Sequence, residues 1–359
     1  MSASFTTSAQ DVQYTQGGAG PQAPWYNPQA MRIGLTYDLQ TDSTDPRQAE
    51  FDPPATVAAL HEALEVLGHR VVRLGSAGQL LADPTVLRQA DLVFNIAEGA
   101  RGRCREAWVP MLLEQWGVPF VGSGSTAQTL ALDKVMSKRL AQASGVATPA
   151  FSVVARPEEW ARAAELGFPL IVKPRYEGSG AGIDAGAVVH DPDALRRRID
   201  WTLSRFHEPC LVEEFIGFGE LTVFLIGNGA PQALPAIQRP LDPATRLSCH
   251  VAGTPSTAWL TPVELTTELD ATACRMATTV FQALRCRDMA RVDLRVDARG
   301  RLYFLEINPL PSFDPEGSVG LMAEYLGVTY SQIVGQILNA ALLRLELPTA
   351  SLDGLAAPR

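Results

Sequence analysis

The sequence predicts an α/β protein of several domains: a parallel α/β layer, a small α+β unit, and a mostly antiparallel sheet. Two observations carry this prediction. Up to about residue 125, apolar strands alternate with helical segments, which is typical of parallel strands joined by crossover helices. From residue 126 onward the strands are short and bounded by turns, which favours antiparallel pairing. A length of 359 residues, 46% of them apolar, agrees with two or three globular domains.

The first domain is predicted at residues 31–125, after a tail. Residues 1–30 are rich in Ser, Thr, Gln, Gly and Pro and have no apolar periodicity, so we expect them to be flexible. The predicted elements of the domain follow in chain order: a strand at 32–38, a helix at 54–68, strands at 71–74 and 91–96, a helix at 104–116 and a strand at 119–121.

A central subdomain is predicted at residues 126–212 and a C-terminal one at residues 213–346, with a tail at 347–359. The central elements are a helix at 126–144, strands at 151–155, 170–174 and 185–190, a helix at 192–205 and a strand at 210–216. The C-terminal elements are strands at 221–226, 291–296 and 302–307 and a helix at 329–346. Residues 229–262 are weakly periodic, and so long a stretch is usually functional or mobile.

Charge and composition exclude several classes of function. The net charge of −9 is unfavourable for binding nucleic acid or anionic lipid. No apolar run is long enough to span a bilayer and nothing resembles a secretory signal, so we expect a cytoplasmic protein without a membrane role. The five cysteines form no CxxC pair and are expected to be reduced thiols.

Only three of the thirty cationic residues are Lys, and a chain this rich in Arg uses Lys where a compact ammonium is needed. We therefore expect Lys134 and Lys173 to stand at positions that need a compact ammonium, whereas Lys138 is expected on a helix face without a role.

A cluster of oxygen ligands is predicted on two paired strands. Because side chains alternate along a strand, Arg291 and Asp293 share one face, and Glu306 and Asn308 share one face of the neighbouring strand. If these faces coincide, two carboxylates and an amide oxygen meet beside a guanidinium. Such a ligand set suits Mg²⁺ shared with phosphates. The alternative is a hairpin with solvated charges, but the apolar neighbours of Glu306 count against it.

Two further segments are candidate sites. Glu177-Gly-Ser-Gly-Ala-Gly182 follows a strand that carries Lys173, and its small residues would let backbone N–H groups approach phosphate oxygens. It is not a Walker A loop, because the lysine precedes the glycines; an ordinary turn is the alternative. The second segment is Leu211–Ile216 followed by Glu220, for which a simple hairpin or a domain hinge is the alternative. The five histidines show no metal-ligand spacing.

In this order and spacing, these segments resemble the ATP-grasp superfamily, and within it the D-alanine–D-alanine ligase-like carboxylate–amine ligases. The resemblance runs from about residue 31 to 345. It is carried by these segments: Asp91-Leu-Val-Phe-Asn95, Leu130-Ala-Leu-Asp-Lys134, Ile171-Val-Lys-Pro-Arg-Tyr-Glu-Gly-Ser-Gly180, Glu213-Glu-Phe-Ile216, Glu220-Leu-Thr222, Arg291-Val-Asp293 and Glu306-Ile-Asn308-Pro-Leu-Pro311. It implies an ATP-grasp fold with a Rossmann-like parallel domain, a central α+β lid over ATP and a C-terminal, mostly antiparallel domain.

The resemblance also implies a role for each matching residue. For ATP, the implied residues are Lys134 and Lys173 at the phosphates, Glu177, Gly178, Ser179 and Gly180 in the phosphate loop, Glu213, Glu214, Phe215 and Ile216 around adenine, and Glu220 at the ribose. Asp293, Glu306 and Asn308 would carry one or two Mg²⁺, with Mn²⁺ as an alternative metal. For the amino-acid substrates, Glu50 would hold the first amino group and Ser318 the second carboxylate. Arg291, Ser179 and Glu50 are the implied catalytic residues.

The implied reaction joins a carboxylate to an amine. Transfer of the γ-phosphoryl group of ATP makes an acyl phosphate, which an amine attacks, releasing ADP and phosphate. The implied partners are small amino-acid, carboxylate or amine substrates, and the resemblance is compatible with a homodimer. The resemblance implies that the glycine loop and residues 229–262 act as lids, which exclude water from the acyl phosphate.

Three departures from the family pattern concern the amino-acid side of the site. Gly180 stands where the family usually has a second Ser, and Ile96-Ala97-Glu98-Gly99 stands where a histidine-glycine turn is common. Residues 229–262 contain neither Tyr nor Lys, which the family's mobile loop usually carries; Arg239, Arg246 and His250 are candidate replacements. We therefore expect non-standard amino-acid substrates in specialised metabolism. A true D-alanine–D-alanine ligase of cell-wall synthesis and a non-catalytic ATP-binding regulator are the alternatives.

Overall fold

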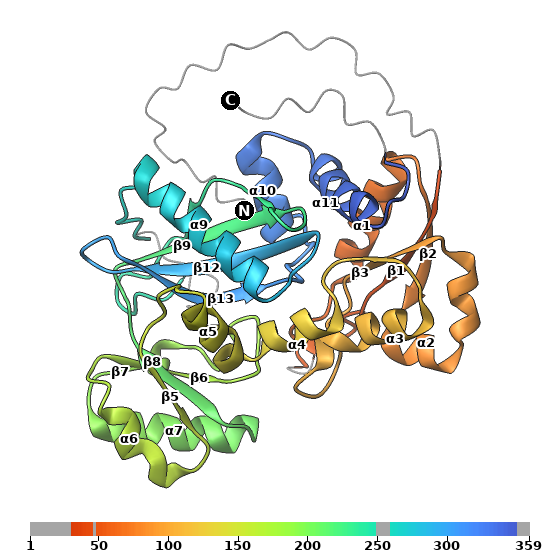
Figure 1. Cartoon of the computed structure of the whole chain (residues 1–359). Helices are drawn as coiled ribbons and strands as arrows, with labels where there is room; N and C mark the ends of the chain where they lie inside the picture. The colour runs from red at the N-terminus through yellow and green to blue at the C-terminus, as the bar shows by residue number, and fades with distance from the viewer. Residues whose placement is uncertain (1–29, 46–47, 249–258, 350–359) are drawn as a thin grey trace.

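The computed structural model describes residues 30–45, 48–248 and 259–349, which form three sheets with helices around them (Figure 1). The tail predicted at residues 1–30 lies outside the described residues except for residue 30, as does most of the tail predicted at 347–359. The predicted α/β class with a parallel first sheet and antiparallel later sheets is confirmed.

The first sheet is parallel throughout, in the order β2-β1-β3-β4. Its strands are β1 (Arg32–Thr36), β2 (Arg70–Gly75), β3 (Leu92–Asn95) and β4 (Phe120–Val121), and its helices are α1 (Pro54–Val66), α2 (Ala77–Ala82) and α3 (Trp108–Trp116), with 3₁₀ turns at Pro84–Gln89 and Arg105–Ala107. Helix α1 begins with Pro54 because proline has no N–H to leave unpaired in the first turn. The chain turns back after the helix at Gly68, whose φ is +87°.

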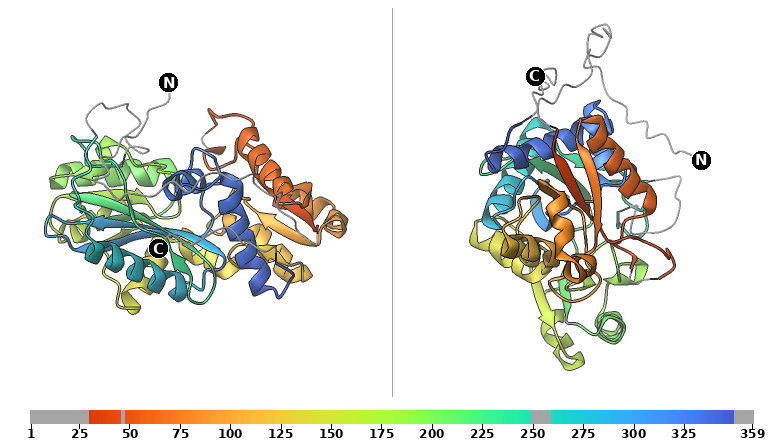
Figure 2. Two further views of the ribbon diagram at one scale, coloured as in Figure 1. Left: turned by 90° about the horizontal axis from the view of Figure 1, so that it is seen from above. Right: turned by 90° about the vertical axis from the view of Figure 1, so that its right-hand side faces the viewer.

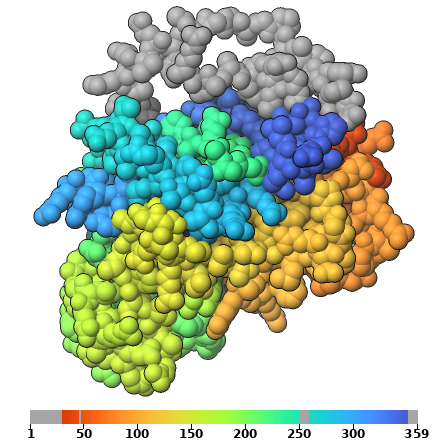
Figure 3. Space-filling model, viewed as in Figure 1, coloured from red at the N-terminus to blue at the C-terminus, as the bar shows by residue number. Residues whose placement is uncertain are grey.

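The middle sheet is antiparallel, in the order β5-β8-β6-β7. Its strands are β5 (Phe151–Val154), β6 (Leu170–Pro174), β7 (Val188–Val189) and β8 (Cys210–Glu214), with helices α6 (Trp160–Ala164) and α7 (Pro192–Phe206) and 3₁₀ turns at Pro157–Glu159 and Ala185–Ala187. One face packs an apolar core against the helices. This subdomain projects from the molecule as a separate lobe (Figure 3). Strand β8 runs through the boundary that the sequence predicted at residue 212.

The C-terminal sheet has the order β10-β9-β12-β13, with β11 also paired to β9. Its strands are β9 (Gly219–Ile226), β10 (Gln232–Ala233), β11 (Ile237–Gln238), β12 (Met289–Val296) and β13 (Leu302–Asn308), and α9 (Thr267–Ala283) covers one face. The pairing of β9, β12 and β13 is antiparallel, as predicted. Short strands β10 and β11 and helix α9 were not predicted, and part of the weakly periodic region, residues 249–258, lies outside the described residues.

The single helix predicted at 126–144 is in fact two, α4 (Ser125–Leu132) and α5 (Lys134–Ala143). They break at Asp133, whose carboxylate accepts hydrogen bonds from the backbone N–H groups of Val135 and Met136 and so caps α5. Their apolar residues belong to the core of the C-terminal sheet. The packing therefore joins both helices to that sheet, whereas the predicted boundary grouped them with the middle one.

Helices α10 (Ser318–Leu326) and α11 (Tyr330–Arg344) join the C-terminal domain to the first domain by packing against both. Seen from above, they lie between the C-terminal sheet and the first sheet (Figure 2). Their apolar residues form one core with α1, β1 and β3 on one side and the ends of β9 and β12 on the other. This core holds the first domain and the C-terminal domain as one body. Among the described residues no single helix is long and apolar enough to cross a membrane, and only the pair α10–α11, bent by 107°, passes on length and composition.

Candidate active site

The predicted oxygen cluster forms across β12 and β13. Their register places Arg291 opposite Asn308 and Asp293 opposite Glu306. A bulge follows, since Leu294 pairs with Phe304 and Leu305 is the extra residue. The bulge begins only after Glu306, so these four side chains share one face. The register thus places the two carboxylates, the amide and the guanidinium on one face of the sheet; that they hold a metal stays a prediction.

Hydrogen bonds and one ion pair hold the side chains of the cluster in place. One Asp293 carboxylate oxygen accepts from Thr222 Oγ1 at 2.7 Å and the other from Arg291 Nε at 3.1 Å. Glu306 Oε2 lies 3.8 Å from Lys134 Nζ. Asn308 Oδ1 accepts from the N–H of Leu310 at 2.9 Å.

The cluster offers only oxygen donors, the kind that Mg²⁺ prefers, so the residues present fit this metal. Burial alone would lower the pKa of Arg291, but the carboxylates of Asp293 and Glu306 outweigh it and raise that pKa, so the guanidinium stays charged. Within the described ranges, no group of three or more His, Cys, Asp and Glu side chains is arranged to hold a metal ion. The predicted ligand set differs from such a group because its third member is an amide.

The glycine loop lies next to this cluster. It begins after β6, and three of its residues have a left-handed backbone: Ser179 at φ +48°, Gly180 at +72° and Gly182 at +70°. Successive turns of this kind point backbone N–H groups into a concavity suited to anions. The loop and the two carboxylates of the oxygen cluster, Asp293 and Glu306, line one open cavity. Its lining includes these predicted site residues: Lys134, Lys173, Glu177, Gly178, Ser179, Gly180, Glu220, Asp293 and Glu306.

All three lysines of the chain converge on this region. Lys134 Nζ donates to the carbonyl oxygen of Glu177 in the glycine loop. Lys173 Nζ forms an ion pair with Glu213 Oε1, and Lys138 Nζ lies 2.8 Å from Glu213 Oε2. The expectation that Lys138 has no role on a helix face is wrong: its side chain is fully buried and also donates to Thr148 Oγ1 at 3.0 Å. The scarcity of lysine in this chain could therefore have indicated a specific, buried position for Lys138 as well as for the other two lysines.

Glu213 sits between two ammonium groups at the start of the segment that links the middle and C-terminal sheets. Burial would raise the pKa of this carboxyl group, but Lys138 and Lys173 outweigh burial and lower it to about 2. Burial lowers the pKa of Lys138, and the negative charge of Glu213 opposes this. The carboxylate is therefore ionised at neutral pH and ties α5 and β6 to β8.

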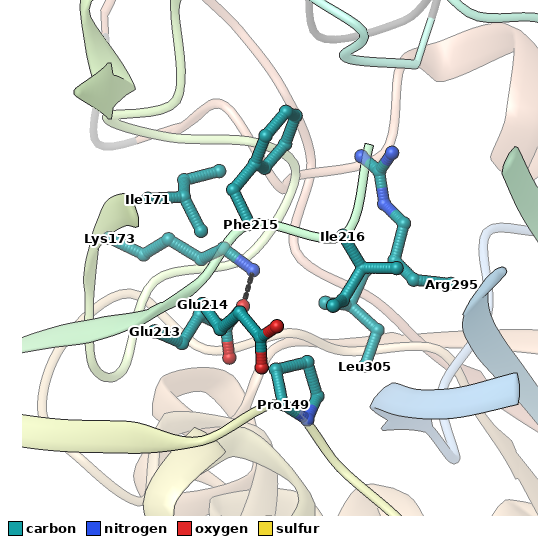
Figure 4. A pocket seen from close by; sticks show the side chains of 9 residues that line it. All are labelled: Pro149, Ile171, Lys173, Glu213, Glu214, Phe215, Ile216, Arg295 and Leu305. Atoms are coloured by element: carbon teal, nitrogen blue, oxygen red, sulfur yellow. Dashed lines mark hydrogen bonds and ion pairs between the residues drawn. The ribbon is translucent and has the colours of Figure 1, made fainter. Parts of the chain in front are cut away.

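A smaller, open pocket adjoins the first one, and the two share Ile171, Lys173, Arg295 and Leu305 (Figure 4). Glu213, Glu214, Phe215 and Ile216 line it together with Pro149. Ile171, Phe215 and Leu305 give this pocket an apolar part of its lining. The structure thus brings the four residues predicted around adenine to the wall of one pocket.

Arg295, which the sequence analysis did not single out, organises the border between the two cavities. Its Nη2 lies 2.9 Å from Glu220 Oε2, and its guanidinium lies 5.6 Å from the centre of the Phe215 ring. Glu220 also accepts from Ser248 Oγ at 2.7 Å. Glu220 therefore lines the larger cavity with its carboxylate held in place.

Ser318 and Glu50, which the resemblance assigns to the two amino-acid substrates, have different partners in the structure. Ser318 begins α10, and its Oγ lies 2.8 Å from Arg291 Nη1. The structure thus joins Ser318 to the oxygen cluster through Arg291. Glu50 is held by Arg105, which the sequence analysis missed, at 2.8 Å from Nε and 2.9 Å from Nη2. Arg105 also donates to the carbonyl oxygen of Tyr176 at 2.9 Å, just before the glycine loop.

Comparison with known proteins gives relatives across most of the chain. The family model described as "D-ala D-ala ligase C-terminus" matches residues 140–339. An uncharacterised protein of Sinorhizobium fredii, y4sG, is 33% identical over 295 residues, which cover 80% of this chain and 86% of that protein. The D-alanine–D-alanine ligase of Cupriavidus necator is 34% identical over 71% of this chain and 77% of its own length. That of Alcanivorax borkumensis is 33% identical over 80% of this chain and 88% of its own length.

Solved structures share the fold. The D-alanine–D-alanine ligase of Bacillus anthracis complexed with ATP superposes with a TM-score of 0.68 at 23% identity, over 89% of this chain and 100% of that one. The VanG D-Ala:D-Ser ligase of Enterococcus faecalis superposes with a TM-score of 0.69 at 19% identity, over 87% of this chain and 100% of that one. With the family model matching more than half of its residues, this chain belongs to the D-alanine–D-alanine ligase family of the ATP-grasp superfamily.

Proposed function

We propose that the protein is an ATP-dependent carboxylate–amine ligase that joins amino acids or similar small molecules and releases ADP and phosphate. The observation that carries the proposal is the cavity shared by the glycine loop, the lysines and the oxygen cluster of β12 and β13. A protein that only bound nucleotide would have little use for carboxylates beside the half-buried Arg291. This counts against a non-catalytic regulator.

Each part of the cavity has a proposed task. The pocket around Phe215 would take adenine, Glu220 the ribose, and the glycine loop with Lys134 and Lys173 the phosphates. Asp293, Glu306 and Asn308 would hold one or two Mg²⁺, or Mn²⁺ in its place, which neutralises charge on the phosphates.

The chain's own groups would then guide the reaction. Arg291 would face the transferring phosphoryl group, where a fixed positive charge favours the acyl phosphate and the later tetrahedral intermediate. Ser318, hydrogen-bonded to Arg291, would place the carboxylate of the amine substrate next to it. The buried surroundings would keep water from hydrolysing the intermediate.

Non-standard amino acids are the substrates that we favour, because the amino-acid side departs from the family pattern. Gly180 supplies no hydroxyl group, the turn after β3 carries Glu98 in place of histidine, and residues 229–262 contain no Tyr or Lys. The second candidate is D-alanine with D-alanine, which the names of the relatives from Cupriavidus and Alcanivorax support. The resemblance is also compatible with a homodimer, and light scattering would test for it.

A matrix assay tests the proposal. Purified protein with Mg²⁺ and ATP is given all pairs of D- and L-amino acids, phosphate release is measured, and products are identified by mass spectrometry. We expect a peptide product from at least one pair, and a hydroxamate from its acyl partner when hydroxylamine replaces the amine. Phosphate release with no trapped acyl group, for every acid tested, would rule out acyl-phosphate chemistry.

A further inference from the structure

The glycine loop, residues 177–182, has few side chains of its own to hold its shape. Ala181 N–H donates to the carbonyl oxygen of Gly178, and Ile183 N–H, directly after the loop, donates to that of Gly180, both at 2.9 Å. The loop is therefore two successive turns, and its glycines lose more conformational freedom on ordering than any other residue would. A loop that presents backbone N–H groups to phosphates in one fixed shape needs contacts from outside itself.

The start of the loop is held by cations from outside the lobe. Lys134 of α5 donates to the carbonyl oxygen of Glu177. Arg105 of the first domain donates to the carbonyl oxygen of Tyr176 at 2.9 Å, one residue before the loop. Both of these hydrogen bonds act at the N-terminal end of the loop.

The far end of the loop is held by Arg198, which lies on α7 within the lobe itself. Its Nη2 donates to the carbonyl oxygen of Gly182 at 2.7 Å, and its Nη1 lies 2.9 Å from Asp184 Oδ1. Asp184 also accepts from the N–H of Gly186 at 2.8 Å, which fixes the chain just after the loop. The two arms of one planar guanidinium thus bridge the last residue of the loop and the turn that follows it.

Packing keeps this guanidinium in one place. Arg198 is 9% exposed, and its guanidinium lies 4.0 Å from the centre of the Trp201 ring. The Trp201 ring meets the Phe206 ring edge-on at 5.9 Å. A Cβ on Gly182 would lie 2.7 Å from Phe206 Cε2, so the end of the loop lies directly against α7. Because α7 shares the core of the lobe with β6, Arg198 has a fixed position relative to the strand from which the loop starts.

One donor of Arg198 is left without a partner. Its Nε is buried and, among the residues that the structure describes, has no hydrogen-bond acceptor. A buried donor without an acceptor carries a free-energy cost, so the orientation of this side chain is not the one that best satisfies its own donors. The orientation directs both terminal nitrogens to the end of the loop.

We propose that Arg198 is a positioning residue that holds the glycine loop in the shape that binds the phosphates of ATP. Arg198 itself contacts no substrate, since the loop and not Arg198 lines the open cavity. Without the guanidinium the loop of the free protein would be less ordered, and the entropy lost on ordering it would offset part of the binding free energy of the triphosphate. Because Arg198 acts only through the loop, the proposal rests on the proposed function, in which the loop binds the phosphates.

The test separates the phosphates from the rest of the nucleotide. With Mg²⁺ present, the non-hydrolysable ATP analogue AMP-PNP and adenosine, which has no phosphate, are each titrated into the full-length protein by calorimetry. The titrations are repeated with Arg198→Met, which keeps an unbranched apolar side chain beside Trp201. The matched control is Arg197→Met, which removes an exposed arginine from the preceding position of α7.

We expect Arg198→Met to bind AMP-PNP roughly 10-fold or more weakly than wild type, the usual size for the loss of hydrogen bonds made by a charged group. Its affinity for adenosine should not change, and Arg197→Met should match wild type for both ligands. Arg198→Lys should show an intermediate loss, because one ammonium cannot span Gly182 and Asp184 as the planar fork does.

Three results would overturn the proposal. One is an affinity for AMP-PNP in Arg198→Met equal to that of wild type. Another is an equal loss for AMP-PNP and adenosine, which indicates a structural role for Arg198 in the lobe as a whole. The third is a wild-type protein that does not bind AMP-PNP. Should Arg198→Met not fold, as judged by circular dichroism, Arg198→Lys and Asp184→Asn carry the test: each should weaken AMP-PNP but not adenosine, and full affinity in both would refute the role of Arg198.

Kinetics distinguish this proposal from the ligase proposal. For any pair of substrates that is ligated, Arg198→Met should raise the KM for ATP and leave the KM of both other substrates unchanged. If peptide forms and the KM for ATP is unchanged in Arg198→Met, the positioning role fails and the ligase stands. If AMP-PNP binding depends on Arg198 as expected but no pair gives a product, the ligase proposal fails and the positioning role stands.

Discussion

Replacing Lys138 by methionine should destabilise the protein strongly. The substitution keeps an unbranched side chain of similar size but removes the ammonium that lies 2.8 Å from Glu213 Oε2. Both side chains are almost fully buried, so removing one partner leaves the other charge poorly compensated. Breaking a buried pair in this way costs about 3–5 kcal/mol. The lowering of the Glu213 pKa from 4.5 to about 2 is the net result after the opposing effect of burial, and it corresponds to about 3 kcal/mol.

The loss of stability in Lys138→Met should depend on pH, and the direction of this dependence follows from the lowered pKa of Glu213. A carboxyl group whose pKa is lowered by folding contributes stability above its unfolded pKa, and this contribution is lost as the pH falls through the folded value. The deficit of Lys138→Met should therefore be largest near pH 7 and shrink below about pH 4.5. Urea denaturation followed by tryptophan fluorescence at pH 7 and at pH 4 measures both values.

Two further variants make the test specific. Arg139→Met changes the next residue of α5, which is exposed, and should cost less than about 0.5 kcal/mol. The double variant Lys138→Met, Glu213→Gln removes the uncompensated charge and should recover part of the loss. If Lys138→Met costs no more than Arg139→Met at pH 7, the argument for a buried charge network around Glu213 is refuted.

Three other substitutions test the site and the first domain. Glu306→Gln should lower kcat for phosphate release by roughly 10²–10³-fold, the usual loss when one electrostatic group is removed, and unchanged turnover would contradict its proposed metal role. Lys173→Arg should raise the KM for ATP, because this 5%-exposed position accommodates an ammonium against Glu213 but not a wider planar fork; a KM like that of wild type would refute this. Burial, with Asp38 and Asp314, raises the pKa of Asp52 to about 7, so the folded protein keeps a proton that the unfolded chain releases near pH 4. Wild-type stability therefore falls as pH rises through this window, and Asp52→Asn should be more stable by up to about 4 kcal/mol above pH 7 in denaturation curves; a pH-independent difference would exclude the effect.

The parts of the fold predicted from sequence are those with strong local periodicity. The parallel layer was predictable because its strands are short, largely apolar runs that alternate with helical segments. Helix α9 was missed because four of its residues are Thr, and β-branched residues weaken the helical signal. The break at Asp133 was missed although Asp is a favoured N-cap, because the apolar pattern continues on both sides of it.

The oxygen cluster was predictable because alternation along a strand fixes which side chains share a face. Arg291, Asp293, Glu306 and Asn308 need only the correct register of one hairpin to meet. The pairing of Arg105 with Glu50 and of Lys138 with Glu213 could not be predicted in this way. These residues are 55 and 75 positions apart in sequence and come together only when separate elements pack.

Because all three lysines are buried, amine-directed reagents find no exposed lysine on this chain. Lys134, Lys138 and Lys173 are 8%, 0% and 5% exposed, and the remaining side-chain cations are arginines, which do not react with amine-directed reagents under mild conditions. Acylating labels and aldehyde probes would find few targets besides the chain's own α-amino group. A pyridoxal or sulfonyl-fluoride reagent that does label a lysine would therefore report on the cleft proposed to bind ATP, and protection by ATP would test that proposal.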